Sequence, residues 1–203
     1  FASALTKIGV GEGDVVSIMA ANTPELFEAH YSVPMTGGVI NTINTRLDTR
    51  TVTYILDHSD CKVFIVDRQF QKVASEALAQ VDRDIIVIDI DDPHSGLGEV
   101  PAIGKLEYES FLANGEKDFE WVRPKDEWQA ISLSYTSGTT GNPKGVVYHH
   151  RGSYLMSMGS VSAWNMPNRL TYLYTVPMFH CNGWGYPWTL AMLHARVILI
   201  RNI

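Results

Sequence analysis

One run of ten residues in the second half of the chain combines hydroxyl side chains, glycines and a lysine. It reads Thr136-Ser137-Gly138-Thr139-Thr140-Gly141-Asn142-Pro143-Lys144-Gly145. Glycines let the backbone come close to a ligand and turn its N–H groups inward, while the hydroxyls and the lysine add donors and positive charge. This composition predicts a cradle for a polyphosphate or a site for the metal ion of a phosphate. A lone carboxylate ligand would rarely need so many donors.

Two better-known phosphate motifs do not match this sequence. A P-loop requires a glycine before its lysine and a hydroxyl residue after it, whereas Pro143 and Gly145 flank Lys144. The dinucleotide fingerprint fails in the run from Gly9, because Asp14 stands where its last glycine belongs. Without a known motif, composition also allows a flexible surface turn.

Short β-rich runs alternate with helical stretches on the N-terminal side of this loop. Strand followed by helix at this spacing is typical of a parallel α/β sheet, and runs that are apolar on both faces indicate a sheet covered on both sides. Thr23 and Pro24 form a plausible helix start. The expected strands are 15–20, 39–41, 62–66 and 85–88 before the loop, 130–135 and 146–148 directly on its two sides, and 197–200 after it. The flanks of the loop are therefore strand–loop–strand, and the expected helices are 1–8, 23–35, 49–57 and 70–79.

The chain of 203 residues is long enough for one or two domains. We expect a first α/β layer over 1–90, an acidic connection over 91–127 with one short helix at 108–113, and a segment over 128–203 that carries the phosphate loop and contributes to a second sheet. The connection holds ten acidic and four basic residues, a balance of −6 that equals the net charge of the whole chain. A docking patch is the alternative to a solvated linker there.

Composition excludes several classes of protein. The net charge of −6 without a block of Lys or Arg argues against a nucleic-acid or anionic-membrane binder, and no apolar run is long enough to span a bilayer. Cys61 and Cys181 have no metal-ligand spacing, so free thiols in a reducing compartment are expected. We therefore expect the cytoplasm, with the peroxisome as the alternative.

The loop and its surroundings resemble the AMP-forming, acyl-activating enzyme superfamily. The run from Tyr135 to Val146 is similar to the signature loop of that family over twelve unbroken residues. The segments 11–22, 24–45 and 176–180 resemble further family segments in the right order. The variant from Pro177 to Trp184 looks closest to the acyl-CoA synthetase branch that handles short, medium-chain or aromatic acids. The resemblance implies the incomplete N-terminal domain of that α/β fold, with mostly parallel sheets flanked by helices.

The resemblance also implies a two-step reaction. A carboxylate attacks the α-phosphate of Mg-ATP, which gives acyl-AMP and pyrophosphate, and a thiol, usually that of coenzyme A, then displaces AMP. The loop hydroxyls would donate to the phosphates, Thr136 would also face Mg²⁺, and Lys144 would neutralise the departing pyrophosphate. The implied nucleotide-binding residues are Thr136, Ser137, Gly138, Thr139, Thr140, Gly141 and Lys144.

The segment around His180 is the second candidate site. A lone histidine among aromatic residues is usually structural, but the resemblance implies a place at the junction of the nucleotide, acyl and pantetheine pockets. Gly183 and Trp184 would contact substrate. The expected apolar acyl slot consists of Phe179, Trp184, Tyr186 and Trp188, so the segment 128–203 would carry both the phosphate loop and the acyl pocket. A dyad of His180 with Cys181 is disfavoured because neighbours on a strand point to opposite faces.

The sequence allows two roles for residues 149–151. His149, His150 and Arg151 could flank the nucleotide loop, or they could form the entrance to a helix that begins at about Ser153.

Three family segments have no counterpart in this sequence: the glutamate that helps to hold Mg²⁺, the aspartate for the ribose, and the C-terminal domain with its lysine. We therefore expect a fragment that is inactive alone and that exposes apolar surface. Three alternatives remain: a carrier-protein thiol as acceptor, a nucleotide-binding module without catalysis, and an NAD-dependent oxidoreductase, which lacks an intact fingerprint.

Overall fold

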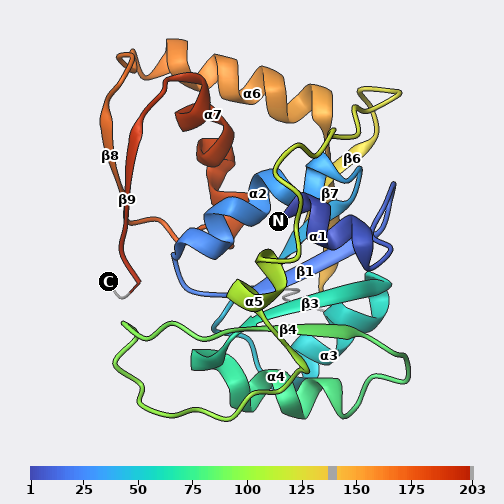
Figure 1. The fold of residues 1–203 in the computed structure, drawn as a ribbon. Helices are drawn as coiled ribbons and strands as arrows, with labels where there is room; N and C mark the ends of the chain where they lie inside the picture. The colour runs from blue at the N-terminus through green and yellow to red at the C-terminus, as the bar shows by residue number, and fades with distance from the viewer. Residues whose placement is uncertain (137–140, 202–203) are drawn as a thin grey trace.

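A parallel sheet forms the centre of the computed structural model, which describes residues 1–136 and 141–201 (Figure 1). Within these residues seven strands lie in the order β5-β4-β3-β1-β2-β6-β7, and β7 alone runs antiparallel to its neighbour. The strands are β1 (Val15–Met19), β2 (Val39–Thr42), β3 (Cys61–Asp67), β4 (Ile86–Ile90), β5 (Leu106–Glu107), β6 (Ala130–Thr136) and β7 (Lys144–His149).

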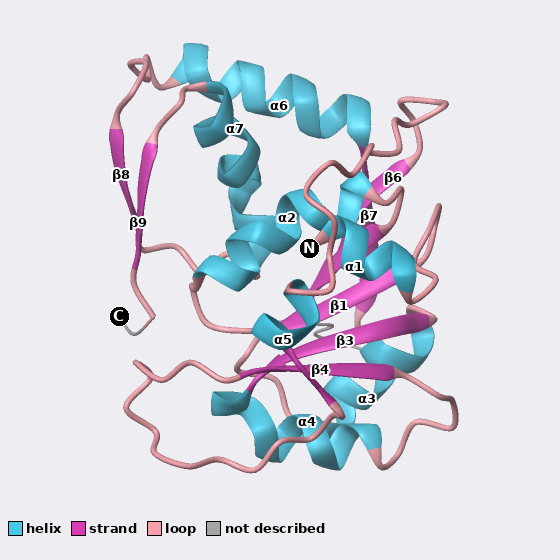
Figure 2. Ribbon diagram, in the orientation of Figure 1, coloured by secondary structure: helices cyan, strands magenta, loops and turns pink. Residues whose placement is uncertain are grey.

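Helices cover both faces of this sheet, which confirms the predicted architecture (Figure 2). The helices α3 (Thr49–His58) and α4 (Gln71–Leu78, preceded by the turn η1, Arg68–Phe70) lie on one face. The helices α1 (Ala2–Lys7), α2 (Pro24–Met35) and α5 (Tyr108–Leu112) lie on the other. Successive residues of β3 serve opposite faces, since Val63 and Ile65 pack in one core and Phe64 and Val66 in the other.

A second, smaller sheet pairs β8 (Thr171–Tyr174) with β9 (Arg196–Leu199) in parallel. Three helical segments belong to the same part of the chain: α6 (His150–Ala163) precedes β8, and the turn η2 (His180–Gly185) and α7 (Tyr186–Met192) connect β8 to β9. Residues 128–203 thus contribute to a second sheet through β8 and β9, as expected, but β6 and β7 of the same segment belong to the first sheet, where β6 pairs with β2 and β7 returns antiparallel beside β6.

Smaller differences concern element boundaries. The strand β5 was not predicted, since two residues carry no pattern of alternation. The helix α6 begins at His150 rather than near Ser153. Thr23 precedes α2 as predicted, but its side chain makes no capping bond.

A proline inside α2 creates the docking point for α7. Pro34 has no N–H and cannot donate to the carbonyl of His30, four residues earlier. The indole Nε1 of Trp188 donates to that carbonyl instead, at 3.0 Å. The hydroxyl of Tyr31 donates to the carbonyl of Pro187 in the same contact. The proline therefore costs one helical hydrogen bond and provides an acceptor for the neighbouring helix.

The His30 side chain is part of the same contact. It is fully buried, its ring packs edge-on against Trp188, and its Nδ1 lies 2.7 Å from the carbonyl of Leu26. Burial lowers the pKa of His30 to about 4, although the bond to Leu26 acts in the opposite direction. The imidazole is therefore neutral near pH 7, and its Nε2 has no partner among the residues the structure describes.

An arginine from the end of the second sheet joins the first sheet. Arg201 donates to buried Asp67 at 2.7 Å and to Asp92 at 2.6 and 2.9 Å. Burial opposes ionisation of Asp92, but hydrogen bonds from the His94 backbone and from Arg201 outweigh it and lower the pKa of Asp92. The two sheets are thus connected at the carboxyl ends of β3 and β4.

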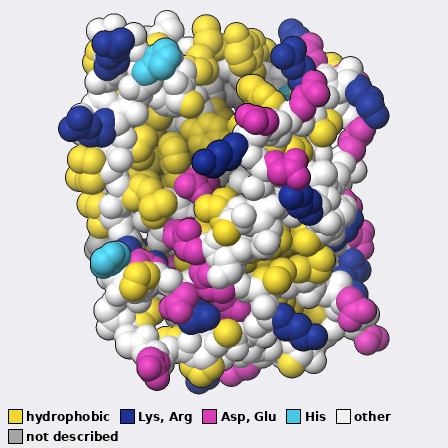
Figure 3. Space-filling model, viewed as in Figure 1, with side chains coloured by type: hydrophobic (Ala, Val, Ile, Leu, Met, Phe, Trp, Pro, Cys, Tyr) yellow, Lys and Arg dark blue, Asp and Glu magenta, His cyan; other side chains and the backbone are white. Residues whose placement is uncertain are grey.

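Large hydrophobic side chains lie exposed on elements at the outer surface of the described part of the chain, as the sequence predicts. They occur on β7, along α6 and on the two strands of the second sheet, and include Val147, Tyr154, Leu155, Trp164, Leu173 and Ile198. Figure 3 also shows hydrophobic side chains around a hollow between β9 and α2. None of the described helices is both long and apolar enough to cross a bilayer.

We predict that Trp188→Phe destabilises the protein through the unpaired carbonyl of His30. The indole donor is lost from a buried acceptor, at a cost of about 1–3 kcal/mol. Adding Pro34→Ala to this variant supplies a new backbone N–H to the same carbonyl and restores part of the stability. Thermal unfolding of the full-length protein measures both effects. Additive losses in the double variant would contradict the account of Pro34.

Candidate functional site

The loop of ten residues connects two strands of one hairpin, which confirms the expected strand–loop–strand arrangement. Thr136 ends β6, Lys144 begins β7, and the two residues pair directly across the hairpin. Side chains of directly paired residues project from the same face of an antiparallel ladder. The hydroxyl of Thr136 and the ammonium of Lys144 therefore share one face at the loop end of the hairpin, and both residues are exposed.

Four of the predicted phosphate-binding residues, Ser137, Gly138, Thr139 and Thr140, lie outside the described residues. Gly141 is exposed, and a Cβ built on it would meet no atom within 4 Å.

The opposite face of the hairpin rests on α3. Tyr135 pairs across the ladder with Gly145, and a Cβ at Gly145 would lie 3.5 Å from the tyrosine ring and 3.1 Å from Leu133. The Tyr135 hydroxyl lies 2.8 Å from Nδ1 of His58, whose ring stacks on Tyr54. Burial raises the pKa of Tyr135 to about 12, so the phenol is protonated at neutral pH. The absence of a side chain at Gly145 leaves room for this aromatic support.

His180 precedes a left-handed turn rather than lying on a strand. Residues 181–185 have φ values of 46°, 45°, 62°, 60° and 66°. Left-handed backbone costs about 1–2 kcal/mol for each residue that carries a Cβ, which here means Cys181, Asn182 and Trp184. We expected the side chains of His180 and Cys181 to point in opposite directions because we placed them on a strand. The strand is absent at these residues, and both line the same cleft.

Close packing explains the glycines of this turn. A Cβ at Gly183 would lie 2.3 Å from the hydroxyl oxygen of Tyr174, and that hydroxyl donates to the Gly183 carbonyl at 2.7 Å. A Cβ at Gly185 would overlap the end of the Met156 side chain. Gly183 is thus buried, and it does not line the cleft in which substrate contact was predicted for it.

A directional chain of hydrogen bonds joins the turn to the central sheet. The hydroxyl of Ser134 on β6 donates to Oδ1 of Asn182. Nδ2 of Asn182 donates to the hydroxyl of Thr42 at 3.1 Å, and Thr42 donates in turn to the carbonyl of Phe179 at 3.0 Å. Ser134, Thr42 and Asn182 are all buried, so each of these polar groups depends on the others for a partner.

Asn22, which follows β1, fixes the segment that leads into the turn. Its Nδ2 donates to the carbonyls of Tyr174 and Val176 at 3.2 and 3.0 Å, and its Oδ1 accepts from the backbone N–H of Met178 at 2.8 Å. The segment from Tyr174 to Met178 thus forms hydrogen bonds with the side chain of Asn22, at the carboxyl end of the sheet, in place of bonds to a neighbouring strand.

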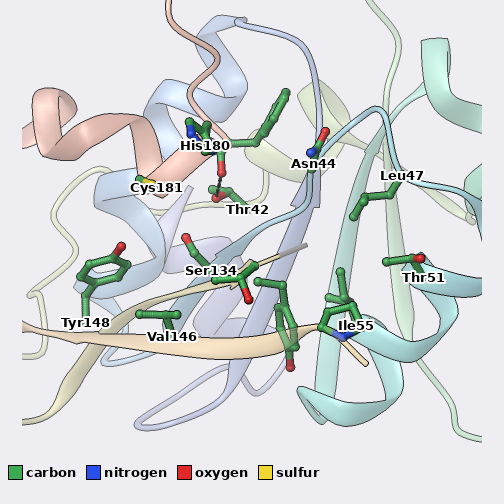
Figure 4. A pocket seen from close by; sticks show the side chains of 14 residues that line it. Thr42, Asn44, Leu47, Thr51, Ile55, Ser134, Val146, Tyr148, His180 and Cys181 are labelled. Carbon is green, nitrogen blue, oxygen red and sulfur yellow. Dashed lines mark hydrogen bonds between the residues drawn. The ribbon is translucent and has the colours of Figure 1, made fainter. Parts of the chain in front are cut away.

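A cleft of about 310 Å³ lies between the hairpin and the turn (Figure 4). Ser134, Val146 and Tyr148 approach it from the hairpin, and His180 and Cys181 approach it from the facing turn. Its lining comprises Thr42, Asn44, Leu47, Thr51, Ile55, Ser134, Tyr135, Thr136, Pro143, Val146, Tyr148, Phe179, His180 and Cys181. The structure therefore brings Thr136 and His180 to one cavity, as the site prediction requires.

The expected aromatic slot is only partly formed by the residues assigned to it. Phe179 lines the cleft. Trp184 is 57% exposed, Tyr186 packs against Tyr172, and Trp188 donates to α2. Among the described residues, Val146 and Tyr148 supply apolar cleft surface that the sequence prediction missed. Their alternation on β7 could have indicated a common face.

The residues after β7 form a helix entrance. His149 caps α6 by accepting from the N–H of Gly152 at 2.9 Å, and Arg151 forms an ion pair with Glu127. His149 pairs with Ala130 at the end of the hairpin opposite to Thr136. His150 is half-buried, and burial lowers its pKa. For His149 and Arg151 these contacts favour the helix-entrance role over contact with the nucleotide loop.

The described residues contain no group of three or more His, Cys, Asp or Glu side chains that could hold a metal ion. Both cysteines are free: Cys61 is buried, which raises its pKa to about 11, and Cys181 is exposed.

The chain belongs to the family of AMP-binding enzymes, whose model matches residues 1–203. It is 42% identical to the peroxisomal acetate/butyrate–CoA ligase of Arabidopsis thaliana and 44% identical to an acetate–CoA ligase of Humulus lupulus. Both matches cover 100% of this chain but only 37% and 38% of those proteins, so the chain spans well under half of their length.

Solved structures show the same fold. An anthranilate–CoA ligase in complex with anthranoyl-AMP superposes with a TM-score of 0.82 at 22% identity, over 100% of this chain and 38% of that one. The N-terminal domain of FACL13 from Mycobacterium tuberculosis, solved with a bound inhibitor, gives a TM-score of 0.80 at 26% identity and covers 100% and 48% of the two chains. The predicted family and fold are confirmed.

We predict that Gly145→Val disturbs the hairpin that carries the loop. The branched side chain would overlap Leu133 and the Tyr135 ring, and overpacking of this kind costs about 1–3 kcal/mol. Hydrogen exchange followed by mass spectrometry should show faster exchange confined to β6 and β7. Gly159→Val, at a glycine with open space around it, is the control. Unchanged exchange in the Gly145 variant would contradict the tight fit.

Proposed function

We propose that the full-length protein is an AMP-forming acid–CoA ligase. ATP and a carboxylic acid give acyl-AMP and pyrophosphate, and the thiol of coenzyme A then attacks the acyl carbon and releases AMP. The observation that carries this proposal is the pairing of Thr136 with Lys144 at the loop end of a hairpin whose face lines the same cleft as His180. Membership of the AMP-binding enzyme family supports it.

The hairpin supplies charge and donors where pyrophosphate leaves. Nucleotidyl transfer depends mostly on positioning and on neutralising charge. Lys144 is exposed, has no acidic partner among the described residues, and can neutralise the departing pyrophosphate. The hydroxyls of Thr136, Ser137, Thr139 and Thr140 would donate to phosphate oxygens, and Gly138 and Gly141 would keep the backbone close.

Magnesium enters this proposal as part of the substrate Mg-ATP. The exposed hydroxyl of Thr136 is one neutral oxygen ligand, which fits a metal ion that arrives with phosphate and water ligands of its own. The described residues contain no carboxylate cluster that would bind Mg²⁺ without ATP.

His180 is the residue we assign to the junction of nucleotide, acyl group and pantetheine. It is exposed to the cleft on the side that faces the hairpin. Trp184 would contact substrate through its exposed ring. Gly183 would contribute by allowing the close packing that holds the turn in place.

Short aliphatic acids are the proposed substrates. The names of three relatives specify acetate and butyrate, acetate, and 2-methylpropanoate. Medium-chain or aromatic acids are the alternative from the motif around His180. A carrier-protein thiol as acceptor, or nucleotide binding without catalysis, are the alternatives for the activity.

We further propose three parts within the chain: 1–90, the acidic connection 91–127, and 128–203. The cytoplasm is the proposed location, supported by the two free cysteines. The peroxisome is the alternative, and one relative carries that compartment in its name.

The test is exchange of labelled pyrophosphate into ATP by the full-length protein, with a panel of carboxylic acids. We expect exchange with short aliphatic acids and a loss of about 10²–10³-fold in Lys144→Ala, the size typical of a removed transition-state donor. Lys125→Ala, a lysine paired with Glu12 at 2.8 Å, is the matched control and should keep full activity.

Absence of exchange with every acid, in a folded protein that binds ATP, would favour the non-catalytic alternative. Exchange that survives Lys144→Ala unchanged would remove the proposed role of the loop. The chain of 203 residues alone should show no acyl-CoA formation.

A further inference from the structure

The turn that carries His180 is held in an unfavourable backbone conformation by side chains from other elements. Three residues with a Cβ, namely Cys181, Asn182 and Trp184, adopt positive φ values in succession with two glycines. Such residues persist only where the surroundings fix them, and they gather at functional sites. Asn182 is 1% exposed. Among the described residues, it is the only one of these three whose side chain forms hydrogen bonds with the central sheet.

The contacts of Asn182 lead directly to the phosphate end of the hairpin. Ser134, which donates to Asn182, lies two residues before Thr136 on the same strand, so their side chains share one face. On the other side, Thr42 receives the Asn182 amide and donates to the carbonyl of Phe179, the residue before His180. One buried amide therefore bridges the strand that ends in the loop and the backbone that presents the histidine.

We propose that Asn182 is a positioning residue that sets His180 relative to Thr136 and Lys144. This inference rests on the proposed function. The amide is suited to the role because it accepts on one side and donates on the other, and because asparagine tolerates the left-handed region better than most residues. Displacement of a reacting group by about 1 Å can cost about 100-fold in rate, so loss of the bridge lowers turnover more than it weakens binding of ATP.

Asn182→Gly is the main test variant, because glycine keeps the left-handed backbone while it removes the amide. In the full-length protein we expect kcat for acid-dependent pyrophosphate exchange to fall by about 10–100-fold, with KM for ATP changed by less than about threefold. Asn182→Asp keeps the acceptor but cannot donate to Thr42, and should show an intermediate loss. Thermal unfolding identifies variants that fail to fold.

A second pair of variants tests the same bridge without touching the turn. Thr42→Val has nearly the same shape but removes the hydroxyl that connects Asn182 to the Phe179 carbonyl, whereas Thr42→Ser retains it. We expect a loss of kcat in the valine variant and rescue in the serine variant. In a His180→Ala background, Asn182→Gly should cause no further loss, because the amide acts through the histidine.

The inference is overturned if Asn182→Gly lowers kcat equally in the His180→Ala background, or if kcat is unchanged while the protein remains folded. An NMR readout separates this inference from the proposed function. The His180 ring resonance, assigned by its absence in His180→Ala, should shift or broaden in Asn182→Gly. If the wild-type protein shows no exchange activity, the proposed function fails. The His180 resonance can still be measured in that case, and an unshifted resonance in Asn182→Gly overturns the positioning role.

Discussion

Buried polar side chains at the carboxyl edge of the sheet are the constraint on which the site depends. Asn22 follows β1, Thr42 ends β2 and Ser134 lies two residues before the end of β6, and each is buried. A buried polar group without a partner costs about 1–3 kcal/mol, so each must find a hydrogen bond. The segment 174–182 supplies these partners. They are its backbone carbonyls, which are not bonded to a neighbouring strand at these points, and the side chain of Asn182. The same bonds that satisfy the sheet edge therefore place the histidine opposite the hairpin.

The same principle holds the second sheet and its helices in place. Pro34 leaves a carbonyl of α2 without its helical donor, and Trp188 of α7 occupies that position. At the far end of the second sheet, Arg201 satisfies the buried carboxylate of Asp67. The layers are thus joined by specific polar contacts at points where the backbone or a strand end leaves a group unpaired. Apolar burial stabilises each layer, and these contacts set how the layers are aligned.

Much of this was accessible from the sequence, and the rest was hidden for physical reasons. Local patterns predicted the strands of the first sheet other than β5 and the strand–loop–strand arrangement around the loop, because periodicity and turn residues act within a few positions. They could not show that β6 pairs with β2, since that pairing joins residues about ninety positions apart. The left-handed turn also escaped prediction, because only Asn182 and two glycines hint at positive φ. The contact of Trp188 with α2, outside the cleft lining, was not predictable either, because it depends on a proline in another helix.

The central claim is that the hairpin at Thr136 and the turn at His180 form opposite sides of one cleft, and that the acyl-adenylate binds there. The most direct measurement is a crystal structure of the full-length protein with a non-hydrolysable acyl-adenylate analogue. The account predicts the phosphate mimic in contact with Thr136 and the acyl carbonyl beside His180, between the hairpin and the turn. An analogue bound in a different cleft, with His180 distant from it, would contradict the account.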